Sequence, residues 1–308
     1  MIVVVIKYIQ YNKIDTMLIR KIKYLIAKSL FFIPDLIMLK IQYRILLKRA
    51  LNIRHPQRFT EKIQYYKAYY HHPEMLRCVD KYLVREFVTE RLGTTKYLNI
   101  LYQVCDSADL IDFTILPSRF VIKTTDGGNG DNILICTNKE LLNQGETVNI
   151  VNSWRNKQYY LISREWAYKG AIQSRIIVEQ YLESDENLDG SINDYKFLCF
   201  DGEFRYLWVD KDRYSDHKRG FWDKDLNFLK NVESDHPTFD IEITLPININ
   251  EMIDIAEKLS KGFPFARIDL YNIKGQIYFG EITFYPWSGY VKYTPDSFDY
   301  ELGAYFNI

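Results

Sequence analysis

The chain contains few of the residues that usually define a metal-stabilised or disulfide-bonded protein. Its 308 residues include four cysteines, no Cys-x-x-Cys pair, and no cysteine with a histidine at metal-ligand spacing. A structural zinc site and a disulfide framework are therefore not expected. We expect reduced structural thiols in a cytoplasmic protein at Cys78, Cys105, Cys136 and Cys199.

The chain also lacks net charge, because 40 Lys and Arg residues balance 40 Asp and Glu residues. The whole-chain charge therefore favours neither a nucleic acid nor a membrane as partner, and we expect no nucleic-acid partner. The balance hides an asymmetry, since residues 1–58 hold 12 basic residues and only two acidic ones, Asp15 and Asp35. A basic arm precedes an acidic body.

A long uninterrupted hydrophobic run is missing as well. The apolar start, residues 1–6, is too short for a signal peptide and is followed by no small-residue cleavage site. Residues 24–39 are apolar but contain Lys28, Pro34 and Asp35, so they should not span a bilayer. Met17 is an alternative start of the chain.

Basic residues alternate with apolar ones around residues 20–28. Such an amphipathic helix either lies on an anionic membrane surface or packs on the body with its basic side in water. The sequence leaves both possibilities open. The basic residues of this stretch are Arg20, Lys21, Lys23 and Lys28.

The composition that remains is that of an ordinary globular protein, with 47% hydrophobic and 26% charged residues. Hydrophobic patterning and stop signals predict helices over residues 36–50, 61–70, 81–92 and 251–261, with Thr60 as the N-cap of the second. Strands are predicted over 97–105, 119–123, 132–136 and 176–181, and hairpins over 195–209 around Asp201-Gly202 and over 266–282. Antiparallel strands flanked by helices predict an α+β fold.

The second hairpin carries the most informative side chains. Because alternate residues of a strand share a face, Arg267 lies with Asp269 and Glu281 lies with Thr283. A three-residue turn, 273–275, would bring all four together, whereas a two-residue turn would separate them. Two carboxylates and a hydroxyl suit Mg²⁺ with phosphate oxygens, and the arginine suits developing phosphate charge. The alternative is a solvated polar strand face with a cross-strand ion pair.

Two other segments are weaker signals. The strand that ends at Lys123 runs into a glycine-rich loop, residues 124–131, whose backbone could approach phosphate, although its spacing matches neither a Walker A loop nor a dinucleotide fingerprint. The strand 176–183 ends in an acid and extended backbone that could hold an adenine edge.

In this order the segments resemble the ATP-grasp superfamily, and more closely its TupA-like branch, which is associated with teichuronopeptide and capsular polysaccharide gene clusters. The resemblance runs from about residue 31 to the end of the chain. It is carried by NIRHPQRFTEKIQYYKAYY (52–70), DKYLVREFV (80–88), residues 120–135, SREWAY (163–168), IVEQYLE (177–183), DYKFLCFDG (194–202) and FPFARIDLYNIKGQIYFGEITFYPWSG (263–289).

The resemblance implies an ATP-grasp fold of two α+β lobes with antiparallel sheets that clasp ATP, preceded by a helical region. The implied parts are a basic helical arm (1–58), a helical or α+β pre-grasp region (59–118), a lid lobe (119–182) and a core lobe with the metal hairpin (183–308).

The resemblance also implies site residues on the nucleotide side. Lys123 and Lys81 would bind phosphate, a glycine lid would cover it, a hinge would meet adenine, and an acid would reach ribose. The lid glycines are Gly127, Gly128 and Gly130; the hinge is Glu179, Gln180, Tyr181 and Leu182; the ribose candidates are Glu183 and Asp185.

On the catalytic side, Asp269 and Glu281 would bind Mg²⁺, with Thr283 where many ATP-grasp enzymes have asparagine. Arg267 would stabilise the transferring phosphoryl group, and Lys196 is a candidate for phosphate or substrate carboxylate.

The implied activity is an ATP-dependent carboxylate–amine ligase that acts through an acyl phosphate on a cell-surface or capsular polysaccharide precursor. The substrate would be a carboxylate-bearing sugar or amino acid, handled in the cytoplasm, with the basic arm at the inner membrane face.

Two alternative functions depend on particular residues. Asp210 and Asp212 form a DxD motif, which a glycosyltransferase could use for a nucleotide sugar. Asp126 before the lid glycines and Trp287 in Pro286-Trp287-Ser288-Gly289 depart from the family pattern and would fit a degenerate, non-catalytic binding protein.

Overall fold

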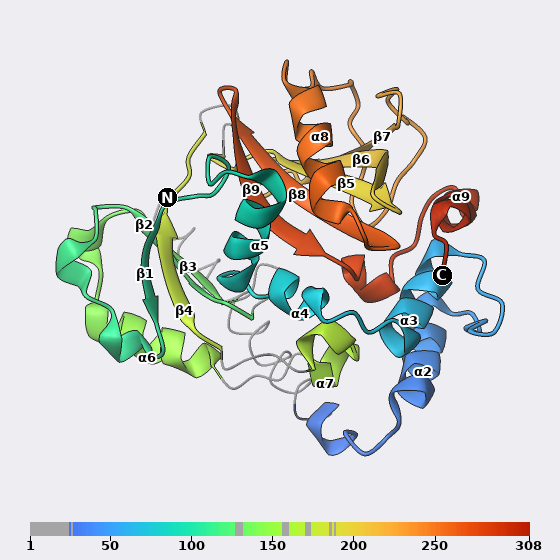
Figure 1. Cartoon of the computed structure of the whole chain (residues 1–308), viewed down its shortest axis with the longest axis horizontal. Coiled ribbons are helices and arrows are strands. Elements are labelled where there is room, and N and C mark those ends of the chain that lie inside the picture. Colours follow the sequence, from blue (N-terminus) through green and yellow to red (C-terminus); the bar gives the residue numbers. More distant parts are fainter. Residues whose placement is uncertain are drawn as a thin grey trace.

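The computed structural model of the chain describes residue 25 and residues 27–126, 132–155, 160–169, 174–184, 187 and 189–308. Two antiparallel sheets and the helices around them form an α+β fold, as the sequence predicted. The first sheet and α6 (Gln144–Trp154) form the left part of Figure 1, and the second sheet and α8 (Ile249–Ser260) form its upper right.

The first sheet has the order β1-β4-β2-β3. One of its faces is apolar and packs against Val151 of α6, with Phe120, Ile122 and Val178 at the centre of the small core. The side chains that alternate with these carry Lys123 and Glu179 on the opposite face. The strands are β1 (Leu101–Cys105), β2 (Phe120–Thr124), β3 (Ile133–Cys136) and β4 (Ile176–Gln180).

The second sheet has the order β7-β6-β5-β8-β9. The predicted hairpin at Asp201-Gly202 is confirmed, and both turn residues have positive φ, 51° and 81°, as a two-residue hairpin turn requires. The strands are β5 (Asp194–Phe200), β6 (Glu203–Lys211), β7 (Lys218–Asp223), β8 (Phe265–Ile273) and β9 (Gln276–Thr283).

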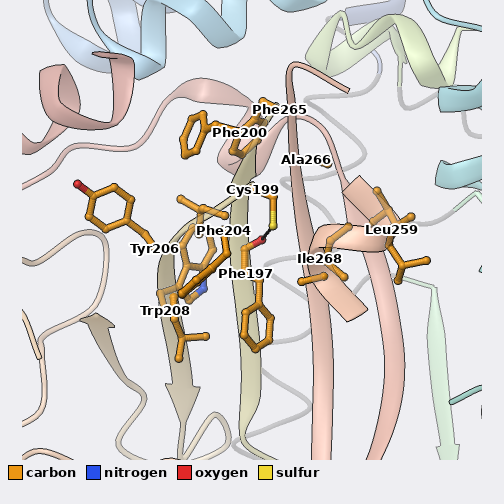
Figure 2. Close-up of a cluster of buried hydrophobic side chains, with 14 of the residues drawn as sticks. Phe197, Cys199, Phe200, Phe204, Tyr206, Trp208, Leu259, Phe265, Ala266 and Ile268 are labelled. Carbon is orange, nitrogen blue, oxygen red and sulfur yellow. Dashed lines mark hydrogen bonds between the residues drawn. The ribbon is translucent and has the colours of Figure 1, made fainter. Parts of the chain in front are cut away.

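The main core lies between this sheet and α8. Leu259 of α8 lies beside Ile268 of β8, and Phe197 of β5 lies on the same face of the sheet (Figure 2). Because one face is filled by apolar side chains, the residues that alternate with them are turned to the opposite face. That opposite face therefore holds the polar residues of β8 and β9.

Two short helices lie between the two sheets. In Figure 1, α4 (Glu74–Val79) and α5 (Leu83–Leu92) lie between them. Arg85 of α5 forms an ion pair with Glu179 of the first sheet at 3.3 Å, and Tyr97 accepts a hydrogen bond from the backbone of Phe279 in the second sheet at 2.7 Å. The segment from α4 to Tyr97 thus fixes one sheet relative to the other.

Helices α3 (Phe59–Tyr69) and α9 (Ser297–Tyr305) pack together at the end of the second sheet. The predicted N-cap role of Thr60 is wrong, because the helix begins at Phe59 and already includes Thr60. The amide and hydroxyl of Thr60 instead donate to the carboxylate of Asp299 in α9, at 2.9 and 2.8 Å. The Glu61 carboxylate accepts the amide of Gln57 at 2.9 Å and so closes the turn before the helix.

Most predicted elements are present within a few residues of their expected bounds. The helix predicted over 81–92 begins at Leu83, and β1 begins at Leu101 rather than at residue 97. Among the elements that the sequence analysis did not predict are α4, β7 and α9.

The basic arm is described only in part. It contains α2 (Asp35–Leu47), close to the predicted helix 36–50. Of the residues in the predicted amphipathic stretch, Arg20, Lys21 and Lys23 lie outside the described residues. Across the described parts of the chain, no helix has both the length and the apolar character that crossing a lipid bilayer demands.

We predict that Gly303→Ala destabilises the protein. A methyl group at Gly303 would lie 2.1 Å from the carbonyl oxygen of Gln57 and 2.8 Å from the amide nitrogen of Phe59, so α9 would have to move away from α3. We expect the free energy of unfolding to fall by about 2 kcal/mol, measured by urea denaturation.

Gly145→Ala in α6 is the matched control, because the nearest atom to a methyl group there is Oδ1 of Asn143 at 3.7 Å. That variant should be neutral or more stable by up to about 1 kcal/mol. Equal stability of the Gly303 variant and the unchanged protein would contradict the close packing of α3 and α9.

Candidate active site

The turn of the β8–β9 hairpin decides between the two arrangements that the sequence left open. Ile273 pairs with Gln276 around a two-residue turn, Lys274-Gly275, in which both residues have positive φ, 51° and 86°. Of the two turns that the sequence left open, the structure therefore has the two-residue one. Continued without interruption, this register would have placed Arg267 and Glu281 on opposite faces of the sheet.

A β-bulge at Gly280 shifts the register and returns Arg267 and Glu281 to the same face of the sheet. The register shifts between Asp269 and Leu270, so Asp269 lies opposite Glu281 and Arg267 lies opposite Thr283. A methyl group at Gly280 would lie 3.0 Å from the carbonyl oxygen of Asp269, closer than ordinary contacts. The four side chains converge on one face, as the sequence analysis described for a three-residue turn, but the bulge and not the turn produces this arrangement.

Arg267 holds this group together. Its Nε donates to Oδ1 of Asp269 and its Nη2 to Oδ2 of Asp269, each at 2.6 Å. The same Nη2 lies 2.9 Å from Oε1 of Glu281 and 3.1 Å from the hydroxyl of Thr283. A planar guanidinium matches two carboxylates in this way, and a lysine could not reproduce the geometry.

The carboxylate of Glu281 is accessible as well as charged. Its side chain keeps 44% of its surface exposed, while that of Asp269 keeps 2%. Burial alone would raise the pKa of Glu281, but Arg267, and then Lys196 and Lys81, lower it to about 2. Glu281 is therefore anionic at neutral pH and keeps part of its side chain in contact with solvent.

The donor set fits a hard divalent cation that is shared with a ligand. Asp269, Glu281 and Thr283 offer two carboxylates and a hydroxyl, the oxygen ligands that Mg²⁺ prefers. In the described parts of the chain, no three His, Cys, Asp or Glu residues are grouped so that they could hold a metal alone. A metal here would need further oxygen atoms, such as those of water and phosphate.

The charged surface continues across β5 and β6. Lys196 of β5 is buried, contacts Asp194, and donates to Oδ2 of Asp269 at 2.9 Å. Its Nζ also lies 3.8 Å from Oδ2 of Asp210 in β6. A lysine surrounded by three carboxylates already has its charge balanced, so Lys196 connects Asp269 to the rest of the sheet.

The two aspartates of the DxD motif have different surroundings. Asp210 is buried, and its Oδ1 accepts hydrogen bonds from Nε of Arg219 at 2.6 Å and from Nε2 of His217 at 3.1 Å. Burial opposes its ionisation, but the His217 hydrogen bond and Arg219 hold the pKa of Asp210 well below its usual range. Asp212 lies beyond the end of β6 with a positive φ of 54°.

The first sheet contributes a lysine and a glutamate. Lys123 Nζ lies 3.0 Å from Oε2 of Glu179, and Nη1 of Arg85 lies 3.3 Å from Oε1. Each oxygen of this buried carboxylate therefore has a cationic partner. Lys123 keeps 27% of its side chain exposed, so it has access to solvent from this position.

Lys81 lies within electrostatic range of both groups. Its backbone amide donates to the carbonyl oxygen of Thr125 at 2.9 Å, which joins the start of α5 to the end of β2. Burial lowers the pKa of Lys81, Glu281 opposes this shift, and Lys123 adds to it. These mutual effects place the ammonium within electrostatic range of both the hairpin and the first sheet.

The predicted adenine hinge begins at the end of β4. The amide of Gln180 donates to the carbonyl oxygen of Ile100 at 2.9 Å, and its own carbonyl oxygen accepts Nδ2 of Asn99 at 2.8 Å. Tyr181 and Leu182 follow as irregular, partly exposed chain. Exposed Glu183 forms an ion pair with Arg119.

Gly127, Gly128 and Gly130 of the predicted lid, and Asp185, lie outside the described residues. Asp126, just before the glycines, is described, and its Oδ1 accepts the hydroxyl of Ser174 at 2.6 Å. Its carboxylate is thus held by a neighbouring side chain.

Trp287 packs inward rather than out toward a ligand. Its ring lies 4.4 Å from that of Trp208, and the guanidinium of Arg219 lies 4.7 Å from its centre. Its indole nitrogen donates to Asp235 at 3.1 Å. Trp287 and Ser288 both have positive φ, 48° and 57°, a conformation that is uncommon for such residues.

A buried cluster supports this turn, and the sequence analysis assigned no role to its members. Lys67 of α3 donates to the carbonyl oxygen and hydroxyl of Ser288, at 2.7 and 2.6 Å, and to the carbonyl oxygen of Ser163 at 3.0 Å. Burial lowers the pKa of Lys67 to about 8, and Glu165 opposes this shift. The signal was available, because Lys67, Ser163 and Glu165 lie within segments that carry the family resemblance.

Solved structures provide three fold comparisons. D-alanine–D-alanine ligase from Bacillus anthracis is 16% identical, with a TM-score of 0.41 over 67% of this chain and 57% of that one. The ligase of the same name from Helicobacter pylori is 14% identical, with a TM-score of 0.44 over 75% and 61%. N5-carboxyaminoimidazole synthetase from Staphylococcus aureus, complexed with ADP, is 15% identical, with a TM-score of 0.39 over 67% and 44%.

The chain spans less than two thirds of the length of these three proteins. A search of the curated proteins finds no match. The family comparison is the decisive one, because the model of the TupA-like ATP-grasp family matches residues 61–307, which include both sheets and the charged hairpin. The chain therefore belongs to the TupA-like ATP-grasp family and has the ATP-grasp fold that its sequence resembles.

Proposed function

We propose that the chain is an ATP-dependent ligase that joins a carboxylate to an amine. The observation that carries the proposal is the convergence of Arg267, Asp269, Glu281 and Thr283 on one sheet face. Lys81 interacts electrostatically with Glu281 of this face and with Lys123 of the other sheet, so groups suited to anions and groups suited to a metal lie within range of one another, as a metal–nucleotide complex requires.

In this proposal Lys123 and Lys81 bind the phosphates of ATP. Lys123 is now paired with Glu179, and that carboxylate also has Arg85 as a partner. Lys123 can therefore turn to a phosphate while Glu179 retains an ion pair. Tyr181 and Leu182 supply the partly exposed backbone for adenine, since Gln180 already uses its amide and carbonyl oxygen.

Asp269, Glu281 and Thr283 would hold Mg²⁺, which would neutralise phosphate charge and orient the transferred group. Arg267 lies against both carboxylates, so it is in position to stabilise negative charge at the same place. Lys196 orients Asp269 through its 2.9 Å hydrogen bond.

The reaction proposed has two steps. A carboxylate oxygen attacks the γ-phosphorus of ATP, ADP leaves, and an acyl phosphate forms. The amine nitrogen then attacks the acyl carbon, inorganic phosphate leaves, and the nitrogen loses a proton to give the amide. Positioning and charge neutralisation account for this chemistry, and no protein nucleophile is required.

We further propose that the carboxylate belongs to a sugar or amino acid of a cell-surface or capsular polysaccharide precursor, modified at the cytoplasmic face of the membrane. Support for this comes from the TupA-like family to which the chain belongs, whose resemblance implies such a substrate.

The glycosyltransferase alternative has less support. Asp210 is buried and bonded to Arg219 and His217, so its carboxylate is already used within the protein. A nucleotide sugar would need to displace these partners. The non-catalytic alternative is weakened by the side chains of the hairpin, which retain their charge and their convergence.

We predict that Asp269→Asn and Glu281→Gln each reduce Mg²⁺-dependent ADP release at least about 100-fold, because each removes a negative ligand where phosphate charge develops. The measurement is ADP release by a coupled assay, with a panel of carboxylates and amines. Glu281→Gln is the more informative variant, since the exposed side chain can change without loss of the fold.

Asp254→Asn and Glu203→Gln are the matched controls, because both carboxylates are exposed and lie away from the hairpin. Both should keep full activity. Undiminished turnover in the Asp269 and Glu281 variants, with circular dichroism showing folded protein, would overturn the metal assignment.

We predict that the protein binds Mg²⁺–ATP and does not bind nucleotide sugars. Lys123→Ala should weaken ATP binding about 10- to 100-fold, the effect of losing a charge-assisted hydrogen bond. Isothermal titration calorimetry measures both affinities, and Lys258→Ala on the exposed side of α8 is the control.

A nucleotide sugar that binds while ATP does not would favour the glycosyltransferase, and Asp210→Asn should then abolish that binding. Binding of ATP without ADP release for any substrate pair would favour the non-catalytic alternative. Equal ATP affinity in the Lys123 variant and the unchanged protein would remove Lys123 from the site.

A further inference from the structure

The basic arm carries an unusual concentration of exposed apolar side chains. Seven large hydrophobic residues between positions 25 and 46 have 42–70% of their surface exposed. Elsewhere in the described residues such side chains are more widely spaced along the chain, apart from Ile133 and Ile135 of β3. The seven are Leu25, Phe31, Phe32, Ile37, Ile41, Ile45 and Leu46.

Helix α2 has two distinct sides. One side is buried through Met38, Leu39, Tyr43 and Leu47. Ile37, Ile41 and Ile45 recur every four residues and form a continuous row on the side turned away from the body. The packing of α2 is therefore satisfied on one side, and its second apolar row has no role in the core.

Basic side chains lie beside this apolar row. Lys40 and Arg44 are exposed on the same outer side, one turn apart, and Lys48 follows at the end of the helix. We call Ile37, Ile41, Ile45, Lys40 and Arg44 together the α2 outer face. It combines a row of isoleucines with a row of positive charge.

The acidic residue of this region is already paired. Asp35 is the single Asp or Glu between positions 25 and 58, and its carboxylate accepts Nη1 of Arg164 at 3.0 Å. Asp296 binds Arg49 and Arg58 at the other end of α2. The cations of the α2 outer face are not matched by these acids, so its charge is positive.

We propose that the α2 outer face docks on the surface of an anionic lipid bilayer. The three isoleucines enter the boundary between headgroups and acyl chains, and Lys40 and Arg44 remain with the anionic headgroups. Adjacent apolar and cationic rows on one helix are the pattern of helices that lie in a membrane interface. This proposal is independent of the ligase function.

The residues that precede α2 and the position of α2 in the molecule also favour contact with a membrane. Phe31 and Phe32 in the turn before α2 are 65% and 70% exposed, and phenylalanine is among the apolar residues that interfacial helices insert into the bilayer. In Figure 1, α2 lies at the edge of the molecule, away from both sheets. The preceding residues 1–24 contain five basic residues and one acidic residue, which increases the positive charge of the arm.

The test is co-sedimentation of the full chain with vesicles. One set contains phosphatidylcholine alone, and the other contains phosphatidylcholine with phosphatidylglycerol at 7:3. We expect binding to the second set only, and weaker binding as salt is added.

Lys40→Glu combined with Arg44→Glu should weaken partition roughly 30-fold or more, given the known attraction per basic residue near an anionic surface. Ile37→Ser, Ile41→Ser and Ile45→Ser together should weaken it about 10-fold or more.

Matched controls are available on the body of the chain. Ile241→Ser with Ile247→Ser removes two isoleucines that are 83% and 100% exposed. Lys230→Glu with Lys292→Glu reverses two exposed charges. Both control variants should sediment with the vesicles as the unchanged protein does. Equal binding of the α2 variants and these controls would overturn the proposal.

A second measurement identifies what contacts the face. The four native cysteines are buried, so a polarity-sensitive fluorophore can be attached at Ile41→Cys. We expect its emission to shift to the blue only when anionic vesicles are added. A blue-shifted emission without vesicles that is independent of protein concentration would mean that residues 1–24 cover the face. A shift that grows with protein concentration would mean that a second copy covers it, and either result would overturn the proposal.

Discussion

A buried guanidinium between two carboxylates is the interaction on which the candidate site depends. Charge on a buried sheet face is costly unless each group has a partner. Arg267 satisfies Asp269 with two hydrogen bonds and reaches Glu281 with a third, while Lys196 joins Asp269 to β5. The same arrangement that makes these charges tolerable keeps them close together. A metal–nucleotide complex could exchange with these internal partners without leaving a buried charge unpaired, which is why this face suits phosphate chemistry.

The rest of the fold brings distant segments to this face. The connection from α4 to Tyr97 fixes the two sheets, and Lys81 interacts electrostatically with Glu281 and with the Lys123–Glu179 pair. On the other side, Lys67 joins α3 to the turn after β9. Several segments that carry the family resemblance are thus neighbours in space, although none of them is informative alone. Together these segments position backbone groups and charged side chains beside the polar face of the second sheet.

Local pattern predicted much of the fold but little of its pairing. Alternation showed that Arg267 shares a face with Asp269, and the turn residues Asp201-Gly202 identified the β5–β6 hairpin, because both signals depend on neighbours in the chain. The missed elements have weaker local signals. β7 is interrupted by Gly220, whose missing side chain makes room for the ring of Phe239, and α4 has six residues. The N-cap role of Thr60 failed because Asp299, 239 residues away, provides its partner.

The sequence by itself determined the α+β class, the residues of the charged hairpin, the family and the unequal distribution of charge along the chain. Only the tertiary structure decided the register of β8 against β9, since a bulge at Gly280 corrects a turn that would otherwise have separated the carboxylates. It also decided that Lys196 is enclosed by carboxylates, that Trp287 packs against Trp208, and that Ile37, Ile41 and Ile45 remain exposed. The physical reason is the same in each case. Pairing, burial and charge neutralisation depend on groups that are far apart in the chain, and residue types and spacing do not specify which of them meet.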